Sequence, residues 1–221
     1  MLSIFDVTGP VMIGPSSSHT AGAARLARVA RALFSGTFHH VSFGLHGSFH
    51  DTFRGHGTDK ALLAGALNIH EDDEALRDAP ALAKRAGITY DYHRVDLHDA
   101  HENSVEITFH LANKKTFTVV GSSIGGGQIV ITRIGNLEME FTALLPTLII
   151  EHLDRRGMFS EITQTLSEAE INIGAMRTSR TARGGYACCL VETDDEIPGE
   201  VVAKVAALHD VYSAKAVNIK S

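Results

Sequence analysis

The chain has 221 residues, 44% of them hydrophobic and 21% charged, and a formal net charge of −6 at pH 7. This size allows two small domains, and the composition is ordinary for a globular protein in water. The negative charge argues against a general affinity for nucleic acid or for an anionic membrane surface. No stretch approaches the ~18 apolar residues of a membrane span, and the first residues lack the basic and apolar segments of a secretory signal. We therefore expect a cytoplasmic protein.

A polar motif at residues 14–22, Gly-Pro-Ser-Ser-Ser-His-Thr-Ala-Gly, stands directly before a stretch rich in alanine and leucine. That stretch predicts a helix over about residues 18–34. The first amides of a helix have no partner within it and lie at the positive end of its dipole, so they can bind a carboxylate or phosphate. One serine would suffice as an N-cap, and a simple cap is the alternative. The motif carries more polar side chains than that, namely Ser16, Ser17, Ser18, His19 and Thr20.

Arg25, Arg28 and Arg31 follow one another at three-residue spacing along the predicted helix. Side chains at this spacing share one face of a helix. We expect a solvated basic stripe; the alternative is a docking surface for an acidic partner or for a substrate carboxylate.

The other elements of the first domain follow from the spacing of apolar residues. Alternation predicts a strand over residues 39–49. A loop at residues 53–59 leads into a helix that ends near residue 67, with Thr58 as its N-cap and Asp59 in its first turn. A further helix is expected over residues 74–86. Strands are expected over residues 88–95, 104–111, 116–120, 128–134 and 137–141, with a glycine-rich loop at 121–127. Helices followed by antiparallel strands make this domain α+β.

The pattern starts again near residue 145. Strands and helices are expected in the order βαββαβ, over residues 147–152, 158–168, 171–180, 186–192, 198–208 and 211–219. This order is typical of the ferredoxin-like fold. We therefore expect one domain at residues 1–145 and a second at residues 146–221.

The second domain resembles an ACT domain, an amino-acid-sensing module. The resemblance rests on residues 152–159, His-Leu-Asp-Arg-Arg-Gly-Met-Phe, and on residues 170–173, Glu-Ile-Asn-Ile. It implies that His152, Asp154 and Asn172 bind the amino and carboxylate groups of an effector between two copies of the domain. Position 154 is often asparagine in serine-sensing members, and an aspartate would favour the ammonium end. The alternative is a domain that only dimerises, since Arg156 stands where a proline or small residue is common.

Histidines beside helix starts indicate a site in the first domain. His19 lies in the polar motif, and His56 lies in the sequence Gly-His-Gly-Thr-Asp at residues 55–59. A third segment, residues 98–103, adds His101 and Asn103 before a strand. These residue types suit a small carboxylate ligand with an acid–base histidine nearby.

Two other kinds of site are less consistent with the sequence. A zinc site would have to assemble from distant loops, because no His-Glu-x-x-His motif and no spaced cysteine pair is present. A serine hydrolase is disfavoured because the neighbouring Ser18 and His19 cannot face each other simply by adjacency, and no nucleophile elbow occurs.

The whole chain resembles the β subunit of the two-subunit, iron–sulfur-dependent L-serine dehydratases of bacteria. The resemblance rests on motifs in a fixed order, at residues 3–7, 14–20, 55–60, 101–107 and 123–127, followed by the ACT-like domain. It implies an allosteric-substrate-binding-like fold for the first domain, as in some phosphoglycerate dehydrogenases. Glu102 stands where the family usually has proline, which affects only the local turn.

The resemblance also implies an activity, the conversion of L-serine to pyruvate and ammonia. A [4Fe–4S] cluster would act on the β-hydroxyl group while a base removes the α-proton. By this resemblance the catalytic side chains are those of His19 and His56. The implied substrate-binding residues are Ser16, Ser17, Ser18, Thr20, Asp59, His101 and Asn103.

The iron–sulfur cluster cannot be built on this chain, because it needs several thiolates close together. The only cysteines, Cys188 and Cys189, are adjacent on a predicted strand and must point to opposite faces. The dehydratase hypothesis therefore requires an α subunit that ligates the cluster, and it predicts that this chain alone is inactive. We also expect a homodimer formed through the ACT domain, the first domain or both. The alternative is a regulatory subunit that binds serine and has no catalytic residues.

Overall fold

The computed structural model describes residues 12–34 and 36–218. The chain divides into two compact units, and the division falls within residues 136–142. Within the described ranges, no helix is both long and apolar enough to cross a membrane. The first motif of the family resemblance, residues 3–7, lies outside the described residues.

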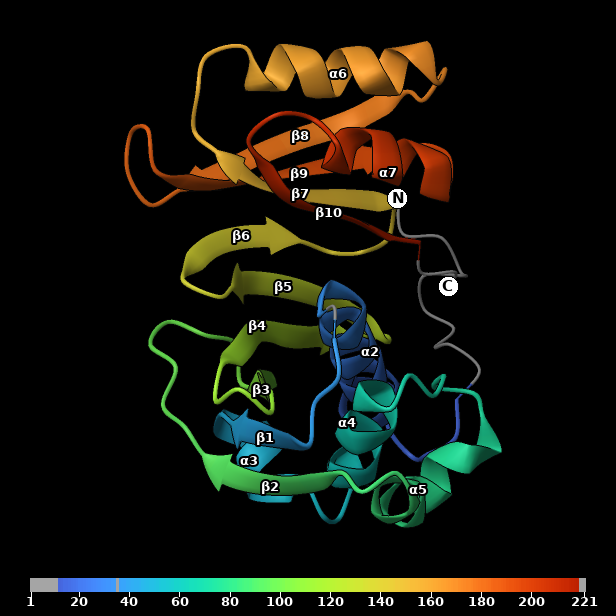
Figure 1. The fold of residues 1–221 in the computed structure, drawn as a ribbon. Coiled ribbons are helices and arrows are strands. Elements are labelled where there is room, and N and C mark those ends of the chain that lie inside the picture. Colours follow the sequence, from blue (N-terminus) through green and yellow to red (C-terminus); the bar gives the residue numbers. More distant parts are fainter. Residues whose placement is uncertain (1–11, 35, 219–221) are drawn as a thin grey trace. The chain divides into compact units, whose positions relative to one another are not determined.

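The first of two sheets has six strands in the order β2-β1-β3-β4-β5-β6 (Figure 1). These strands are β1 (His40–Leu45), β2 (Thr89–Arg94), β3 (Ser104–His110), β4 (Thr116–Gly125), β5 (Gln128–Ile134) and β6 (Leu137–Phe141). Strands β1 and β2 run parallel, whereas β3 pairs antiparallel with β1 and β4. The helices are η1 (a π-helix, Ser17–Gly22), α2 (Ala23–Leu33), α3 (Gly47–Thr52), α4 (Thr58–Ala66), η2 (a 3-10 helix, Glu74–Asp78) and α5 (Ala79–Arg85). The α+β class expected from the sequence is confirmed.

Helix α2 lies at the centre of this unit, and eight of its eleven residues are buried. It packs against α4 and against strands β4 and β5. A Cβ atom at Gly65 of α4 would overlap the carbonyl oxygen of Ala24, and one at Gly22 would overlap the Ser123 hydroxyl on β4. Both helix contacts are therefore closer than any larger residue would allow. This closeness fixes where η1, which carries the polar motif, meets the sheet.

The arginine stripe on α2 is not solvated as expected. Arg25 is only 7% exposed, and Arg28 Nη2 lies 3.2 Å from Glu71 Oε2, with both side chains largely buried. Arg31 Nη1 donates a hydrogen bond to the Phe34 carbonyl (2.8 Å). The three-residue spacing correctly predicted that the arginines share one face of α2. It could not show that other segments of the chain cover this face.

Three local expectations in the first unit are wrong. The strand expected over residues 39–49 ends at Leu45, and the short helix α3 follows it. Thr58 is the first residue of α4 rather than its cap; the cap is Gly57, in the left-handed conformation (φ 71°) that glycine adopts without strain. Residues 121–125, expected as a loop, continue β4, where Ser122 and Ser123 are buried.

The second unit contains a four-stranded antiparallel sheet in the order β10-β7-β9-β8. Its elements are β7 (Thr147–Leu153), α6 (Met158–Glu168), β8 (Ile173–Arg180), β9 (Tyr186–Thr193), α7 (Gly199–Ala206) and β10 (Val211–Val217). Leu148 and Ile150 of β7 pack with Ile162 of α6 and Val201 of α7 in one core. Both helices therefore cover the same face of the sheet, and the expected ferredoxin-like order is confirmed.

We expect the Gly65→Ala substitution to destabilise the first unit by about 1–3 kcal/mol, the usual cost of overpacking. The added methyl group would push α4 away from α2 at Ala24. Thermal or urea denaturation measures the loss. Gly55→Ala is the matched control, since its Cβ would meet nothing closer than 3.7 Å. Equal stability of the two variants would contradict the close helix contact.

Candidate functional site

The polar motif forms a π-helical turn whose start is capped by Ser16. Ser16 Oγ accepts a hydrogen bond from the backbone N–H of His19 (3.1 Å), and its carbonyl accepts one from Thr20 N (2.9 Å). Thr20, fully buried, donates its hydroxyl to the carbonyl of His56 (3.1 Å). This bond ties the motif to the second histidine loop, so two segments distant in sequence form one site.

The imidazole rings of His19 and His56 lie side by side, with their centroids 4.8 Å apart. His19 also packs edge-on against the buried ring of Phe49 (5.3 Å), and its Nε2 lies 3.3 Å from Ser48 Oγ. Burial, and next the charge of His56, lower the pKa of His19 below its usual value. His19 is therefore neutral at pH 7 and able to accept a proton.

Ser48 and Phe49 were missed by the sequence analysis. Both belong to α3. The apolar alternation of the residues before α3 had predicted that the strand continues through them. The remaining signal was the Gly-Ser pair at residues 47–48, which is typical of a turn after a strand. Residues 50–56, including His56, line a surface hollow of about 660 Å³.

Asn103 and Ser123 form a second part of the site against η1. Ser123 N donates to the Asn103 carbonyl (2.9 Å), and Gly22 of η1 lies directly against Ser123. Asn103 Oδ1 and Ser123 Oγ are both buried and have no hydrogen-bond partner among the described residues. Unpaired buried polar atoms are costly, so they mark a place where a polar ligand atom would gain partners.

The other residues predicted for this site are less closely joined to it. Ser17 and Ser18 are half-buried in η1. His101 is exposed, and its Nδ1 accepts a hydrogen bond from Asn103 N (3.1 Å) within the same turn. Asp59 is the second residue of α4, and its carbonyl accepts a hydrogen bond from Tyr92 Oη (2.6 Å).

The cysteines do not fit an iron–sulfur cluster. Cys188 and Cys189 are buried on β9, and burial raises the pKa of each thiol to about 12. Cluster ligation requires thiolates. Across residues 12–34 and 36–218, no group of three or more histidine, cysteine or acidic side chains is arranged to hold a metal ion.

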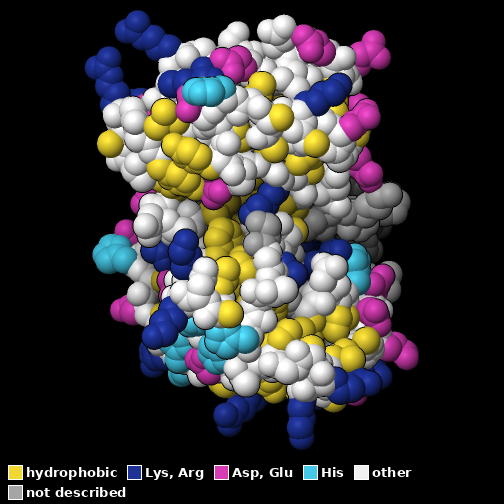
Figure 2. All heavy atoms as spheres, in the orientation of Figure 1, with side chains coloured by type: hydrophobic (Ala, Val, Ile, Leu, Met, Phe, Trp, Pro, Cys, Tyr) yellow, Lys and Arg dark blue, Asp and Glu magenta, His cyan; other side chains and the backbone are white. Residues whose placement is uncertain are grey.

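A separate histidine cluster lies on the first sheet, where Figure 2 shows histidine side chains gathered over the region of β1 and β2. Asp91 Oδ2 accepts from Ser42 Oγ (2.7 Å) and lies 2.8 Å from His40 Nε2. Ser42 Oγ also lies 3.0 Å from His110 Nε2, and His93 Nδ1 lies 3.0 Å from Asp91 Oδ1. Burial raises the pKa of Asp91, but hydrogen bonds from Ser42, His93 and His40 outweigh it and lower the pKa overall. The cluster is a satisfied polar network rather than an open site.

The residues that the ACT resemblance implied for an effector are only partly available. His152 is fully buried, and its Nδ1 donates to the Leu153 carbonyl (2.9 Å). Its Nε2 is buried and has no partner within the part of the chain that the structure describes. Asp154 is already paired, accepting hydrogen bonds from Gly184 N (2.9 Å) and Arg180 Nη1 (2.7 Å). These bonds lower the pKa of Asp154 and leave little of its charge for a ligand ammonium group.

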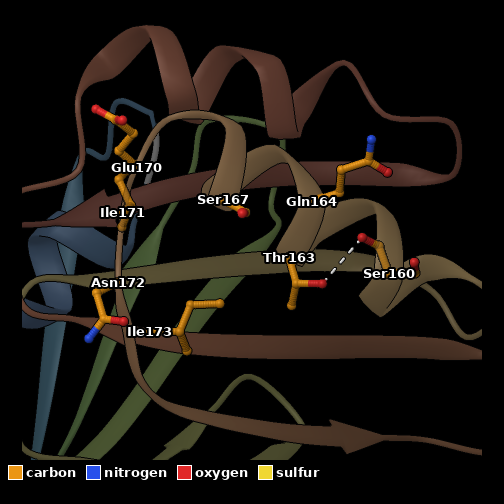
Figure 3. Close-up of a pocket in the computed structure, with 8 residues that line it drawn as sticks. All are labelled: Ser160, Thr163, Gln164, Ser167, Glu170, Ile171, Asn172 and Ile173. Carbon is orange, nitrogen blue, oxygen red and sulfur yellow. Dashed lines mark hydrogen bonds between the residues drawn. The ribbon is translucent and has the colours of Figure 1, made fainter.

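Asn172 lies at a groove that contains neither His152 nor Asp154. Figure 3 shows the groove between α6 and the segment that leads into β8. It has a volume of about 610 Å³ and hydroxyl groups on one side, from Ser160, Thr163 and Ser167. Asn172 Nδ2 donates to Asp194 Oδ2 (2.6 Å). Within one chain, therefore, the three predicted effector residues do not form one pocket.

We predict that the pKa of His19 rises when His56 is replaced by alanine. Both causes of the lowered value, burial and the neighbouring charge, weaken in His56→Ala. The Cε1–H resonance of His19, followed by NMR between about pH 4 and pH 9 across the usual histidine range, measures the change. His209→Ala, at an 86% exposed side chain in the second unit, is the control and should leave the titration unaltered. An unchanged or lower pKa in His56→Ala would contradict the pairing of the two rings.

Comparison with known proteins places these observations in a family. The family model described as serine dehydratase beta chain matches residues 3–89, and the ACT domain model matches residues 146–210. The chain is 38% identical over 218 residues to the L-serine dehydratase, beta chain, of Peptoniphilus asaccharolyticus, covering 98% of both chains. It is 36% identical over 209 residues to the probable L-serine dehydratase, beta chain, of Bacillus subtilis, covering 95% of this chain and 94% of the relative.

The chain is also similar, at lower sequence identity, to an enzyme of a different kind. The D-3-phosphoglycerate dehydrogenase of Methanocaldococcus jannaschii is 27% identical over 161 residues, which is 72% of this chain but only 30% of that enzyme. The shared part is thus a segment of a longer protein, whereas the serine dehydratase β chains match from end to end. The chain belongs to the family of L-serine dehydratase β chains and carries a C-terminal ACT domain.

Proposed function

We propose that this chain positions L-serine and supplies acid–base histidines in a two-subunit L-serine ammonia-lyase, acting with an α subunit. The observation that carries the proposal is the pair formed by His19 and His56, with ring centroids 4.8 Å apart beside the polar motif. Removal of the α-proton of an amino acid needs a base that is unprotonated at the working pH. The lowered pKa of His19 meets that requirement.

The two histidines can have different roles in proton transfer. A neutral His19 accepts the proton at its unprotonated ring nitrogen, and its ring is oriented by Ser48, whose Oγ lies 3.3 Å from Nε2. The charge that then develops on His19 is disfavoured by the adjacent His56, so the proton is readily passed on to the departing β-hydroxyl group, which leaves as water. Backbone amides at the start of η1, with the hydroxyl groups of Ser17 and Ser18, would bind the carboxylate. Ser16 caps the turn and Thr20 holds it to the His56 carbonyl, so these two residues would shape the site rather than contact the carboxylate.

We further propose that the [4Fe–4S] cluster of this enzyme is held by the α subunit, where it would assist departure of the β-hydroxyl group. The described cysteines of this chain are buried thiols and do not fit such a cluster. The chain alone is then inactive, and its part in the assembly is to bind, orient and exchange protons.

A purely regulatory role is the second candidate, favoured by the ACT domain match over residues 146–210. In that case both units bind serine or a related acid, and all chemistry takes place on the partner. The two candidates differ in what the histidines do at saturating substrate.

We predict that His19→Ala lowers kcat of the reconstituted two-subunit enzyme by about 10²–10⁴-fold, the range for loss of a general base. His56→Ala should give a smaller loss. The α subunit is combined anaerobically with each variant, and turnover is measured at saturating L-serine. His209→Ala, exposed and outside the first unit, is the control. If His19→Ala leaves kcat unchanged and alters only KM, the regulatory role is correct.

For the ACT domain we predict that the purified chain binds L-serine and that Asn172→Ala weakens this binding by about tenfold or more. Loss of a hydrogen bond to a charged ligand group has this magnitude. Calorimetry on the full chain measures both affinities. Gln128→Ala, at an exposed position of β5, is the control. Equal affinity of wild type and Asn172→Ala would remove Asn172 from the effector site.

A further inference from the structure

A small pocket is lined by both partners of the Thr20–His56 hydrogen bond. Its volume is about 150 Å³, and its walls include Ile13, Pro15 and Leu76. Leu76 is only 3% exposed, so it gives the pocket a buried apolar wall. The Thr20 hydroxyl, donated to the His56 carbonyl at 3.1 Å, holds the wall that the pocket shares with the histidine site.

The size of the pocket limits what it can hold. An apolar cavity of about 150 Å³ in another protein accommodates benzene, which has six heavy atoms. A ligand here would thus have about six heavy atoms, with one apolar end in the pocket.

Basic side chains line this pocket. Lys60, in the first turn of α4, and Arg77, on η2, both line it together with His56. Among the described lining residues there is no acidic side chain. Guanidinium and ammonium groups bind carboxylates and repel a ligand ammonium group.

We propose that this pocket binds a short monocarboxylate that carries no ammonium group, such as a 2-oxo acid. Its methyl end would lie against Leu76 and its carboxylate between Lys60 and Arg77. The reaction proposed above converts a ligand with an ammonium group into one without it, so the interpretation of the pocket as a product site rests on that proposed function. The proposal that the pocket binds a monocarboxylate does not rest on that function. Because His56 borders both sites, occupancy of the pocket would weaken the binding of serine at His19.

NMR of the full chain, with pyruvate as the probe, tests the proposal. Amide resonances of Gly14, Gly57 and Arg77 should shift saturably as pyruvate is added up to about 20 mM, which exceeds a millimolar Kd. Lys60→Gln and Arg77→Gln should each weaken binding by about tenfold. Both side chains are exposed, so the fold should persist. Lys84→Gln, exposed on α5 and not lining the pocket, is the control and should bind as wild type does.

Two further ligands test which charged groups of the ligand the pocket recognises. Pyruvamide lacks the negative charge, and L-alanine carries an ammonium group in place of the oxo group of pyruvate. Both should bind about tenfold more weakly than pyruvate. Absence of saturable shifts with pyruvate, equal binding of pyruvamide, or tighter binding of L-alanine or L-serine at these amides would overturn the proposal. None of these results bears on the turnover of His19→Ala, so failure of the pocket and failure of the proposed function can be told apart.

Discussion

The close approach of η1 and α2 to their neighbours is the constraint on which the rest of the first unit depends. Gly22 and Gly65 have no side chain where one would meet Ser123 or the Ala24 carbonyl. The start of the helix can therefore lie directly on β4 and α4. A helix start held by packing on two sides does not need its serines for stability. One serine, Ser16, caps the turn, and the others remain available for binding.

The same packing explains how the pKa of His19 can stay low beside the positive end of a helix. The amides at the start of η1 favour negative charge, and the neighbouring His56 disfavours a second positive charge on His19. Phe49, buried beneath, removes water from one side of the ring. In the proposed function the site would combine binding of a carboxylate with proton acceptance, and a permanently charged His19 would allow only the first of these tasks.

The fold was largely predictable, because apolar spacing identifies long elements and the βαββαβ order is distinctive. Parts of the site were predictable for a different reason: His19 and His56 stand in polar loops beside helix starts. Ser48 was hidden because a short helix directly after a strand leaves no pattern of its own. Arg25 was misjudged because charge suggests exposure, whereas burial depends on what packs over α2.

The histidine cluster on the first sheet shows the limit of sequence spacing most clearly. His40, Asp91 and His110 come from three strands and meet only through the sheet register, which pairs residue 40 with both 89 and 110. Register depends on pairing between distant segments and cannot be inferred from the spacing within one of them. The small pocket at Lys60 and Arg77 is similar, because it forms where α4 and η2 pack together.

The two cysteines have a practical consequence for labelling this chain before it is combined with a partner. Both thiols are buried, with pKa values of about 12, so at neutral pH they are almost entirely protonated and out of reach of maleimides or iodoacetamide. Thiol reagents should therefore not label the native chain. One cysteine introduced at an exposed position would be a unique attachment point for a dye or spin label, with no need to remove the natural cysteines first.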